Sequence, residues 1–127
     1  MKREVIHTNA APAAVGPYSQ AIRLGSMVYS SGQIPLDPET GEIVAGGIKE
    51  QAERALTNLR SVIEASGSSL GQVIKVTCFI TDMKMFGDMN AVYAGFFGEN
   101  PPARSCVGVA SLPKGALVEF EAVATTD

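Results

Sequence analysis

The sequence contains no tryptophan, one histidine, two cysteines and few aromatic residues. Aromatic side chains make up 6% of its 127 residues. A nucleic-acid surface needs stacking groups or clustered lysine and arginine, and the chain has neither in quantity. Its formal net charge of -3 points the same way. We therefore expect no nucleic-acid partner.

Metal-ligating residues are also scarce. A zinc site needs three or four ligands at short spacings, and His7 lies far in sequence from Cys78 and Cys106. No glycine-rich phosphate loop is present either. The sequence thus predicts neither a metal nor a cofactor. Each cysteine lies inside a strand-like segment, which predicts reduced thiols rather than a disulfide framework.

Long apolar runs are missing as well. No segment approaches the roughly 18 residues needed to span a bilayer, and no apolar run typical of a signal peptide follows the first residues. We expect a cytoplasmic protein with no membrane-spanning segment. Because 46% of the residues are apolar, the chain can bury a core, and its length suits one domain over residues 1–127.

The spacing of apolar residues predicts two helices and several strands. In residues 48–66, apolar side chains recur at spacings of three and four residues and form one stripe. Residues 86–97 form a second, largely aromatic stripe that ends before Gly98. Asn90 lies off that stripe, whose members we expect to be core. Strands are predicted at residues 4–8, 19–24, 27–31, 73–81, 101–109 and 117–124. This order predicts an α+β fold with two helices packed on one face of a mixed sheet.

The strand around Arg104 carries the charge that its surroundings least explain. Alternation along the strand places Arg104 and Cys106 on one face and Val107 and Val109 on the other. We expect the valines to face the core, so that Arg104 projects from the opposite face. An arginine there needs a carboxylate, a phosphate or open water. A surface guanidinium or a structural ion pair is the alternative.

The last strand contributes carboxylates to the same predicted face. In residues 117–124, Glu119 and Glu121 alternate with apolar side chains such as Phe120. A short loop precedes this strand, so we expect it to be an antiparallel neighbour of the Arg104 strand. Simple closure of the loop would leave Glu119 about 13 Å from Arg104. A bulge, a bridging substrate and water, or a contact across a subunit boundary could each close that distance.

The face without helices is expected to be mixed and partly apolar. It would carry Lys75, Thr77 and Phe79, together with Cys106 and Gly108. Faces of this kind are commonly buried against other copies of the same chain. The sequence therefore predicts an oligomer, and a monomer with a solvated sheet face is the alternative.

Four short motifs, in this order, resemble the RidA family, also called the YjgF family. They are GPYSQ at residues 16–20, SGQIP at 31–35, PARSCV at 102–107 and EFEA at 119–122. The resemblance covers essentially the whole chain. It implies a homotrimer of chorismate-mutase-like subunits with sites at the subunit interfaces. It also implies an enamine and imine deaminase that hydrolyses 2-aminoacrylate or 2-aminocrotonate to a 2-keto acid and ammonia.

The resemblance also implies roles for individual residues. Arg104 would bind the substrate carboxylate, Glu119 would position the hydrolytic water, and the backbone at Cys106 would contact the ligand. The other positions that it implies at the site are Tyr18, Ser31, Gly32 and Asn90. This agrees with chemistry, because a guanidinium can grip a carboxylate through two parallel hydrogen bonds and a carboxylate can activate water. No cofactor is needed, since a protonated imine is already electrophilic.

Several alternatives stay open at this point. Glu121 competes locally with Glu119, and no histidine lies near Cys106 in the pattern to activate a catalytic thiolate. Tyr18 could only pack a loop, and Ser31 could only bind backbone at a strand end. The segment 98–100 is shorter than in some relatives, which could alter the site rim and substrate preference. The alternative functions are a keto-acid or carboxylate sensor, a stress-response module or, against the acidic balance, a ribonuclease or translation inhibitor.

Overall fold

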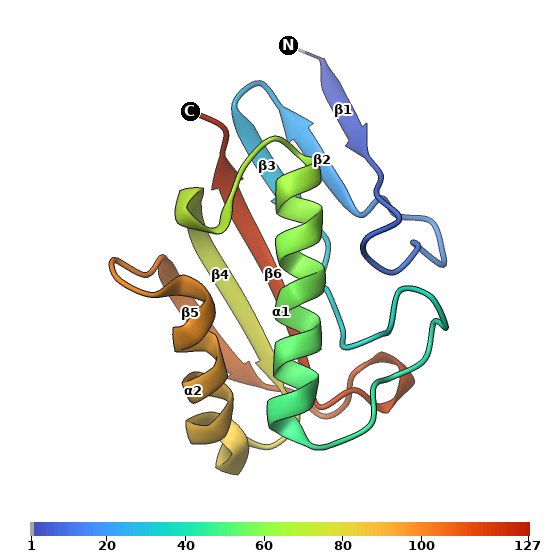
Figure 1. Cartoon of the computed structure of the whole chain (residues 1–127), viewed down its shortest axis with the longest axis vertical. Helices are drawn as coiled ribbons and strands as arrows, with labels where there is room; N and C mark the ends of the chain where they lie inside the picture. Colours follow the sequence, from blue (N-terminus) through green and yellow to red (C-terminus); the bar gives the residue numbers. More distant parts are fainter. Residues whose placement is uncertain (1) are drawn as a thin grey trace.

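A computed structural model describes residues 2–127 as one six-stranded sheet with two α-helices against one of its faces (Figure 1). The strands have the order β1-β2-β3-β6-β4-β5 across the sheet. The elements in chain order are β1 (Arg3–Ile6), β2 (Ala21–Leu24), β3 (Met27–Ser30), α1 (Ile48–Ala65), β4 (Val73–Ile80), α2 (Phe86–Phe97), β5 (Ala103–Gly108) and β6 (Val118–Thr125). Three short 3-10 turns, η1 (Leu70–Gln72), η2 (Met83–Met85) and η3 (Pro113–Gly115), connect them. The predicted α+β class and both predicted helices are confirmed.

Helix α1 forms where the apolar spacing predicts it and crosses the middle of the sheet (Figure 1). Glu50 Oε1 accepts a hydrogen bond from the Gly47 backbone N–H at 2.8 Å, which satisfies a free donor at the helix start. Gly67 has a φ of 88° just beyond the last turn, a conformation that favours glycine and ends the helix. These local features define the two ends of α1.

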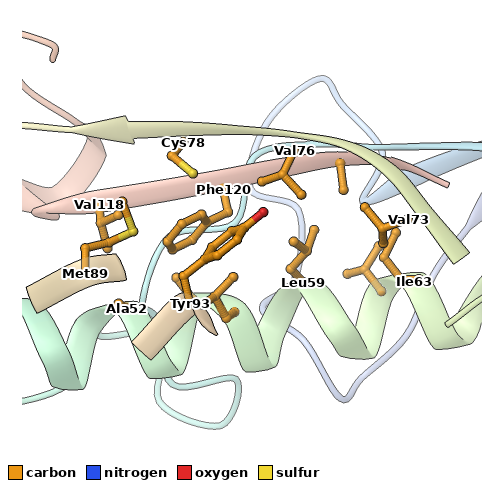
Figure 2. Packing of buried hydrophobic residues seen from close by; sticks show 14 of the residues in the cluster. Ala52, Leu59, Ile63, Val73, Val76, Cys78, Met89, Tyr93, Val118 and Phe120 are labelled. Atoms are coloured by element: carbon orange, nitrogen blue, oxygen red, sulfur yellow. The ribbon is translucent and has the colours of Figure 1, made fainter. Parts of the chain in front are cut away.

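The core lies between the helices and the central strands (Figure 2). Phe120 from β6 and Cys78 from β4 point towards Leu59 of α1 and Tyr93 of α2. The side chains of Phe120, Cys78 and Leu59 are fully buried. Alternate residues of β4 and β6 consequently face the helices, and the residues between them face the opposite side of the sheet.

The strand that carries Arg104 is not a neighbour of the strand that carries Glu119, because β4 lies between them. β4 pairs with β5 in parallel and with β6 antiparallel. Val109 N–H donates to the Ile80 carbonyl and Thr81 N–H donates to the Leu117 carbonyl, so the β5–β6 connection passes around the end of β4. Nine residues easily span two strand spacings of about 4.8 Å each. The expected antiparallel pairing of β5 with β6 is therefore wrong.

Arg104 and Cys106 face the helices, which also corrects the sequence prediction. In the register of the parallel pair, Arg104 lies beside Val76 and Cys106 lies beside Cys78, and both of these β4 residues are buried under the helices. Val107 instead lies on the opposite face and is 44% exposed. β5 is an edge strand that α2 covers only in part. Its helix-side positions can thus hold a charge, and valine does not mark the core face there.

The sheet face without helices, which we call the open face, mixes apolar, polar and charged side chains. Thr77 and Phe79 lie on it as expected, and Lys75 Nζ donates to Ser105 Oγ across it at 2.9 Å. Exposed Tyr29 adds to its apolar surface. Cys106 and Gly108 were also expected there, but their register partners Cys78 and Ile80 are buried on the helix side. Within residues 2–127, no helix has both the length and the apolar character needed to cross a bilayer.

Candidate functional site

Four of the seven predicted site residues line one cleft of about 490 Å³. They are Tyr18, Ser31, Gly32 and Glu119, which come from the loop before β2, the end of β3 and the start of β6. Glu121 and Lys114 line the same cleft. We call it the Glu119 cleft. It brings together residues that lie up to a hundred positions apart in the sequence.

The end of β3 is built to leave room for the Glu119 carboxylate. Gln33 and Phe120 exchange two backbone hydrogen bonds, of 2.7 and 3.1 Å, which hold the chain after β3 against β6. A Cβ atom at Gly32 would lie 2.5 Å from Oε2 of Glu119, well inside van der Waals contact. Any larger residue at position 32 would displace the carboxylate. The SGQ sequence therefore fixes where Glu119 can lie.

The hydroxyl of Ser31 has a structural bond. It donates to the Ser19 carbonyl, and Ser31 N–H donates to the Gln20 carbonyl. Gln20 in turn donates from Nε2 to the Pro12 carbonyl at 2.8 Å. These bonds tie the N-terminal loop to β3, so the loop that carries Tyr18 has a defined position. Tyr18 itself is 49% exposed at the mouth of the cleft.

The electrostatics of the Glu119 cleft favour a basic carboxylate. Glu119 is partly buried, and this burial raises the pKa of its carboxyl group above the ordinary value. The nearby charge of Glu121 raises the pKa of Glu119 further. Lys114 lines the same cleft, but its Nζ donates to the Gly41 carbonyl at 3.0 Å. A carboxylate with a raised pKa accepts a proton from water more readily than an ordinary one.

Arg104 lies against one face of α2. Its Nη1 donates to Asn90 Oδ1 at 2.7 Å. The guanidinium carbon lies 4.6 Å from the ring centroid of Tyr93 and 5.4 Å from that of Phe86. Among residues 2–127, these contacts include no carboxylate. The cation is therefore held in a fixed orientation by neutral groups, with donors left for an anion.

The sequence missed the part that Tyr93 and Phe86 play beside Arg104. Both were expected to be core, with Asn90 off their stripe. Positions 86, 90 and 93 are spaced by four and three, however, so they share one helix face, and that face meets Arg104. This spacing was a signal that could have been read. Among the described side chains, the Tyr93 hydroxyl is buried without a hydrogen-bond partner, and burial raises its pKa to about 12.

Cys106 lies beside Cys78 on the helix side of the sheet. Burial raises the pKa of the Cys106 thiol, and it raises the pKa of Cys78 to about 12. A thiol with a raised pKa is a poor nucleophile at neutral pH. Burial of these thiols therefore disfavours a thiolate at Cys106; the backbone contact that the resemblance implies there stays a prediction. Across residues 2–127, no three metal-ligating side chains gather as a cation site would require.

In one copy of the chain, the sheet separates Arg104 from Glu119. Arg104 is in register with Val76 on the helix side, whereas Glu119 is in register with Phe79 on the open face. Arg104 and Glu119 are offset by two strand spacings across the sheet and by three residues along the strands, and each of these two offsets is about 10 Å. The β4–β6 register shift falls at residues 73–75, away from Glu119. Within one copy of the chain, a bulge or a small bridging ligand does not bring these groups together through a packed sheet.

Comparison with known proteins gives close relatives over nearly the whole chain. The family model described as Endoribonuclease L-PSP matches residues 8–126. A RutC family protein of Pyrococcus abyssi is 52% identical over 98% of both chains. The mouse protein named 2-iminobutanoate/2-iminopropanoate deaminase is 46% identical over 96% of this chain and 90% of its own. The crystal structure of Escherichia coli TdcF with bound serine superposes with a TM-score of 0.93 at 48% identity, covering 98% of this chain and 99% of that one.

Proposed function

Because the chain belongs to the endoribonuclease L-PSP family, also called the RidA family, we propose that it hydrolyses 2-imino acids to 2-keto acids and ammonia. Its substrates are 2-aminoacrylate, 2-aminocrotonate and their imine tautomers. The observation that carries this proposal is the Arg104 guanidinium, which is oriented by Asn90 and two aromatic rings and has no carboxylate partner among residues 2–127. A relative named as a deaminase of such imines supports the reaction class.

Arg104 binds the substrate carboxylate in this proposal. Asn90 takes one of the two Nη1 hydrogens and leaves the remaining guanidinium donors for a planar anion. Two parallel hydrogen bonds fix the orientation of the carboxylate and hence of the neighbouring imine carbon. The rings of Tyr93 and Phe86 restrain the guanidinium before the substrate arrives. Little conformational entropy is then lost when the substrate binds.

Glu119 acts as the general base. It takes a proton from water as the water oxygen forms a bond to the carbon of the protonated imine, and the electron pair of the C=N π bond moves to nitrogen and leaves a neutral amine. Glu119 then gives this proton to the amine, which leaves as ammonia, and takes the proton of the new hydroxyl as the keto group forms; ammonia carries this last proton away as ammonium. Burial and Glu121 raise the pKa of Glu119, which suits it to these proton transfers. No metal or cofactor is required by these steps.

The complete site lies between two copies of the chain. Arg104 of one copy and Glu119 of its neighbour would meet at the boundary, which removes the separation that the sheet imposes within each copy. The partly apolar open face supplies a surface for such packing. A cyclic assembly repeats the same boundary at every copy, and the family resemblance points to a homotrimer with three sites.

The test couples the protein to a dehydratase that releases 2-aminocrotonate from threonine. The protein should speed the appearance of 2-ketobutyrate over a buffer control. Glu119→Gln keeps the size and loses the base, so turnover should fall about 10²- to 10⁴-fold while 2-ketobutyrate still binds. Arg104→Lys should weaken 2-ketobutyrate binding, because an ammonium cannot form the two-bond grip.

Three results would contradict this function. A wild-type protein that binds keto acids but never accelerates their release would be a carboxylate sensor. A Glu119→Gln variant with wild-type turnover would make Glu119 a bystander. An Arg104→Lys variant with unchanged affinity for 2-ketobutyrate would show that Arg104 does not bind the carboxylate through two hydrogen bonds.

A further inference from the structure

A second cavity lies beside Arg104 at the edge of the sheet. Its volume is about 490 Å³. The residues that line it are Asn90, Tyr93, Ala94, Phe97, Gly98, Pro101, Pro102 and Arg104. One wall is a guanidinium and most of the others are aromatic, proline or small apolar groups. The cavity therefore combines a fixed cation with an apolar hollow.

The cavity is formed by the way the chain leaves α2 and enters β5. Gly98 ends the helix with a φ of 56°, and Asn100 also has a positive φ of 53°, so the chain turns sharply there. Two prolines then hold it extended as it reaches the edge strand. The ring centroids of Tyr93 and Phe97 lie 4.6 Å apart, and both residues line the cavity. This turn contains residues 98–100, the segment that the family resemblance indicated as able to alter substrate preference.

We infer that this cavity is the subsite for the substrate side chain and that it favours 2-imino acids with branched aliphatic or aromatic side chains. The inference rests on the proposed function, because it takes Arg104 as the anchor of the carboxylate. In a 2-imino acid the side chain is attached two bonds from the carboxylate carbon. Because Arg104 is itself part of the cavity lining, a carboxylate bound to it brings the neighbouring side chain to this cavity.

Size and charge support this assignment. A pocket near 490 Å³ is within the range that encloses small organic ligands, and it is far larger than the methyl or ethyl group of the smallest substrates requires. The Glu119 cleft also has apolar residues in its lining, but it contains two carboxylates and Lys114. A side chain bound there would remove water from these charged groups, whereas the guanidinium that binds the carboxylate is the one charged group among the described residues that line the cavity beside Arg104.

The experiment measures the binding of stable 2-keto acids that share one carboxylate and differ in side chain. Pyruvate, 2-ketobutyrate, 4-methyl-2-oxopentanoate and phenylpyruvate form the series, with calorimetry as the readout. Each fully buried methylene strengthens binding about fourfold. We expect 4-methyl-2-oxopentanoate and phenylpyruvate to bind at least about tenfold tighter than pyruvate, which allows for partial burial.

A filling substitution tests the location of the subsite. Ala94 lines the cavity and is exposed on α2, so Ala94→Phe can extend into the hollow without burying a new side chain in the core. It should lower the affinity ratio of phenylpyruvate to pyruvate at least about tenfold, since the bulky side chain loses its space. Ala91→Phe is the matched control, because Ala91 is exposed on the same helix and does not line the cavity. Its ratio should stay at the wild-type value.

Two outcomes would overturn the inference. One is a wild-type protein whose affinity does not rise along the series. The other is an equal change of the affinity ratio in Ala94→Phe and Ala91→Phe. Failure of the proposed function has a different signature: the series and the effect of Ala94→Phe would persist, and the coupled dehydratase assay would show no turnover.

Discussion

Glu119 and Glu121 project from the same face of β6 and line the same cleft, and the charge of Glu121 raises the pKa of Glu119. The base must be ionised to take a proton from water, and a raised pKa means that activity is lost at a higher pH on acidification. Glu121→Gln removes a negative neighbour and should lower the pKa of Glu119. The acid limb of the kcat/KM profile should then move to lower pH. Burial remains, so the pKa of Glu119 should stay above its ordinary value.

The control for this shift is Glu64→Gln on the exposed side of α1, which removes the same charge far from the cleft. Its profile should match the wild type. An acid limb that does not move in Glu121→Gln would mean that Glu119 is not the group whose ionisation limits the rate. A limb that moves equally in both variants would point to net charge rather than to the local pair.

Single residues could be predicted from the sequence better than their surroundings could. Arg104 was singled out as a charge that local sequence does not explain, and the structure places it against neutral groups of α2. The resemblance implied Asn90 at the site, but neither its hydrogen bond to Arg104 nor the contact of Tyr93 with Arg104 was predicted, since both depend on the packing of α2 on β5. Gly32 was assigned to the site by resemblance. The physical reason for a glycine there is the space that the Glu119 carboxylate occupies, and this is seen only in the three-dimensional structure.

Secondary-structure elements followed from the sequence, and their order across the sheet did not. The helix predicted at residues 48–66 spans Ile48–Ala65. Its bounds could be predicted because apolar periodicity and the glycine after the last turn are local signals. The position of β4 between β5 and β6 depends on a connection that passes around a strand end, and nothing in a loop of that length specifies this. A two-residue turn would have required adjacent strands, but a nine-residue connection permits one strand between them.

The open face is the element whose burial in an assembly can be tested directly. Thr77 lies at its centre, in register with Ser105 on one side and Glu121 on the other. Thr77→Glu would place another carboxylate beside Glu121 and would bury that charge if copies pack there. Light scattering should give the mass of a trimer for the wild type and a lower mass for Thr77→Glu at micromolar concentration. Circular dichroism should be unchanged, because the substitution is on the face away from the helices.

Thr57→Glu provides the matched control for assembly. Thr57 lies on α1, where its hydroxyl donates to the Glu53 carbonyl on the solvent side. The same change of residue there adds charge without touching the open face. Assembly should be retained. Equal loss of mass in both variants, or a wild-type protein that is monomeric, would contradict burial of the open face.

At the scale of the whole molecule, the family could be predicted and the geometry of the complete site could not. Four short motifs sufficed for the family, because they span the chain in a fixed order and each has a local role. The sequence left open whether Arg104 and Glu119 of one site belong to the same copy. Their opposite sheet faces follow from the strand order, which the sequence does not specify. Because the sheet lies between the two groups, the proposed hydrolysis requires an assembly in which Arg104 of one copy meets Glu119 of another.

A mixing experiment tests that requirement. Arg104→Lys and Glu119→Gln chains are each expected to be inactive alone, because every boundary lacks one of the two groups. When the two variants are unfolded together and refolded in equal amounts, a boundary is complete if its Arg104 comes from the Glu119→Gln chain and its Glu119 from the Arg104→Lys chain. Random assembly of a cyclic oligomer gives this arrangement at about one quarter of boundaries, so turnover should return to about one quarter of the wild-type value. Variants refolded separately and then mixed without exchange should stay inactive. If both groups of a site belonged to one copy, co-refolding would restore nothing, because each copy would still lack one of them.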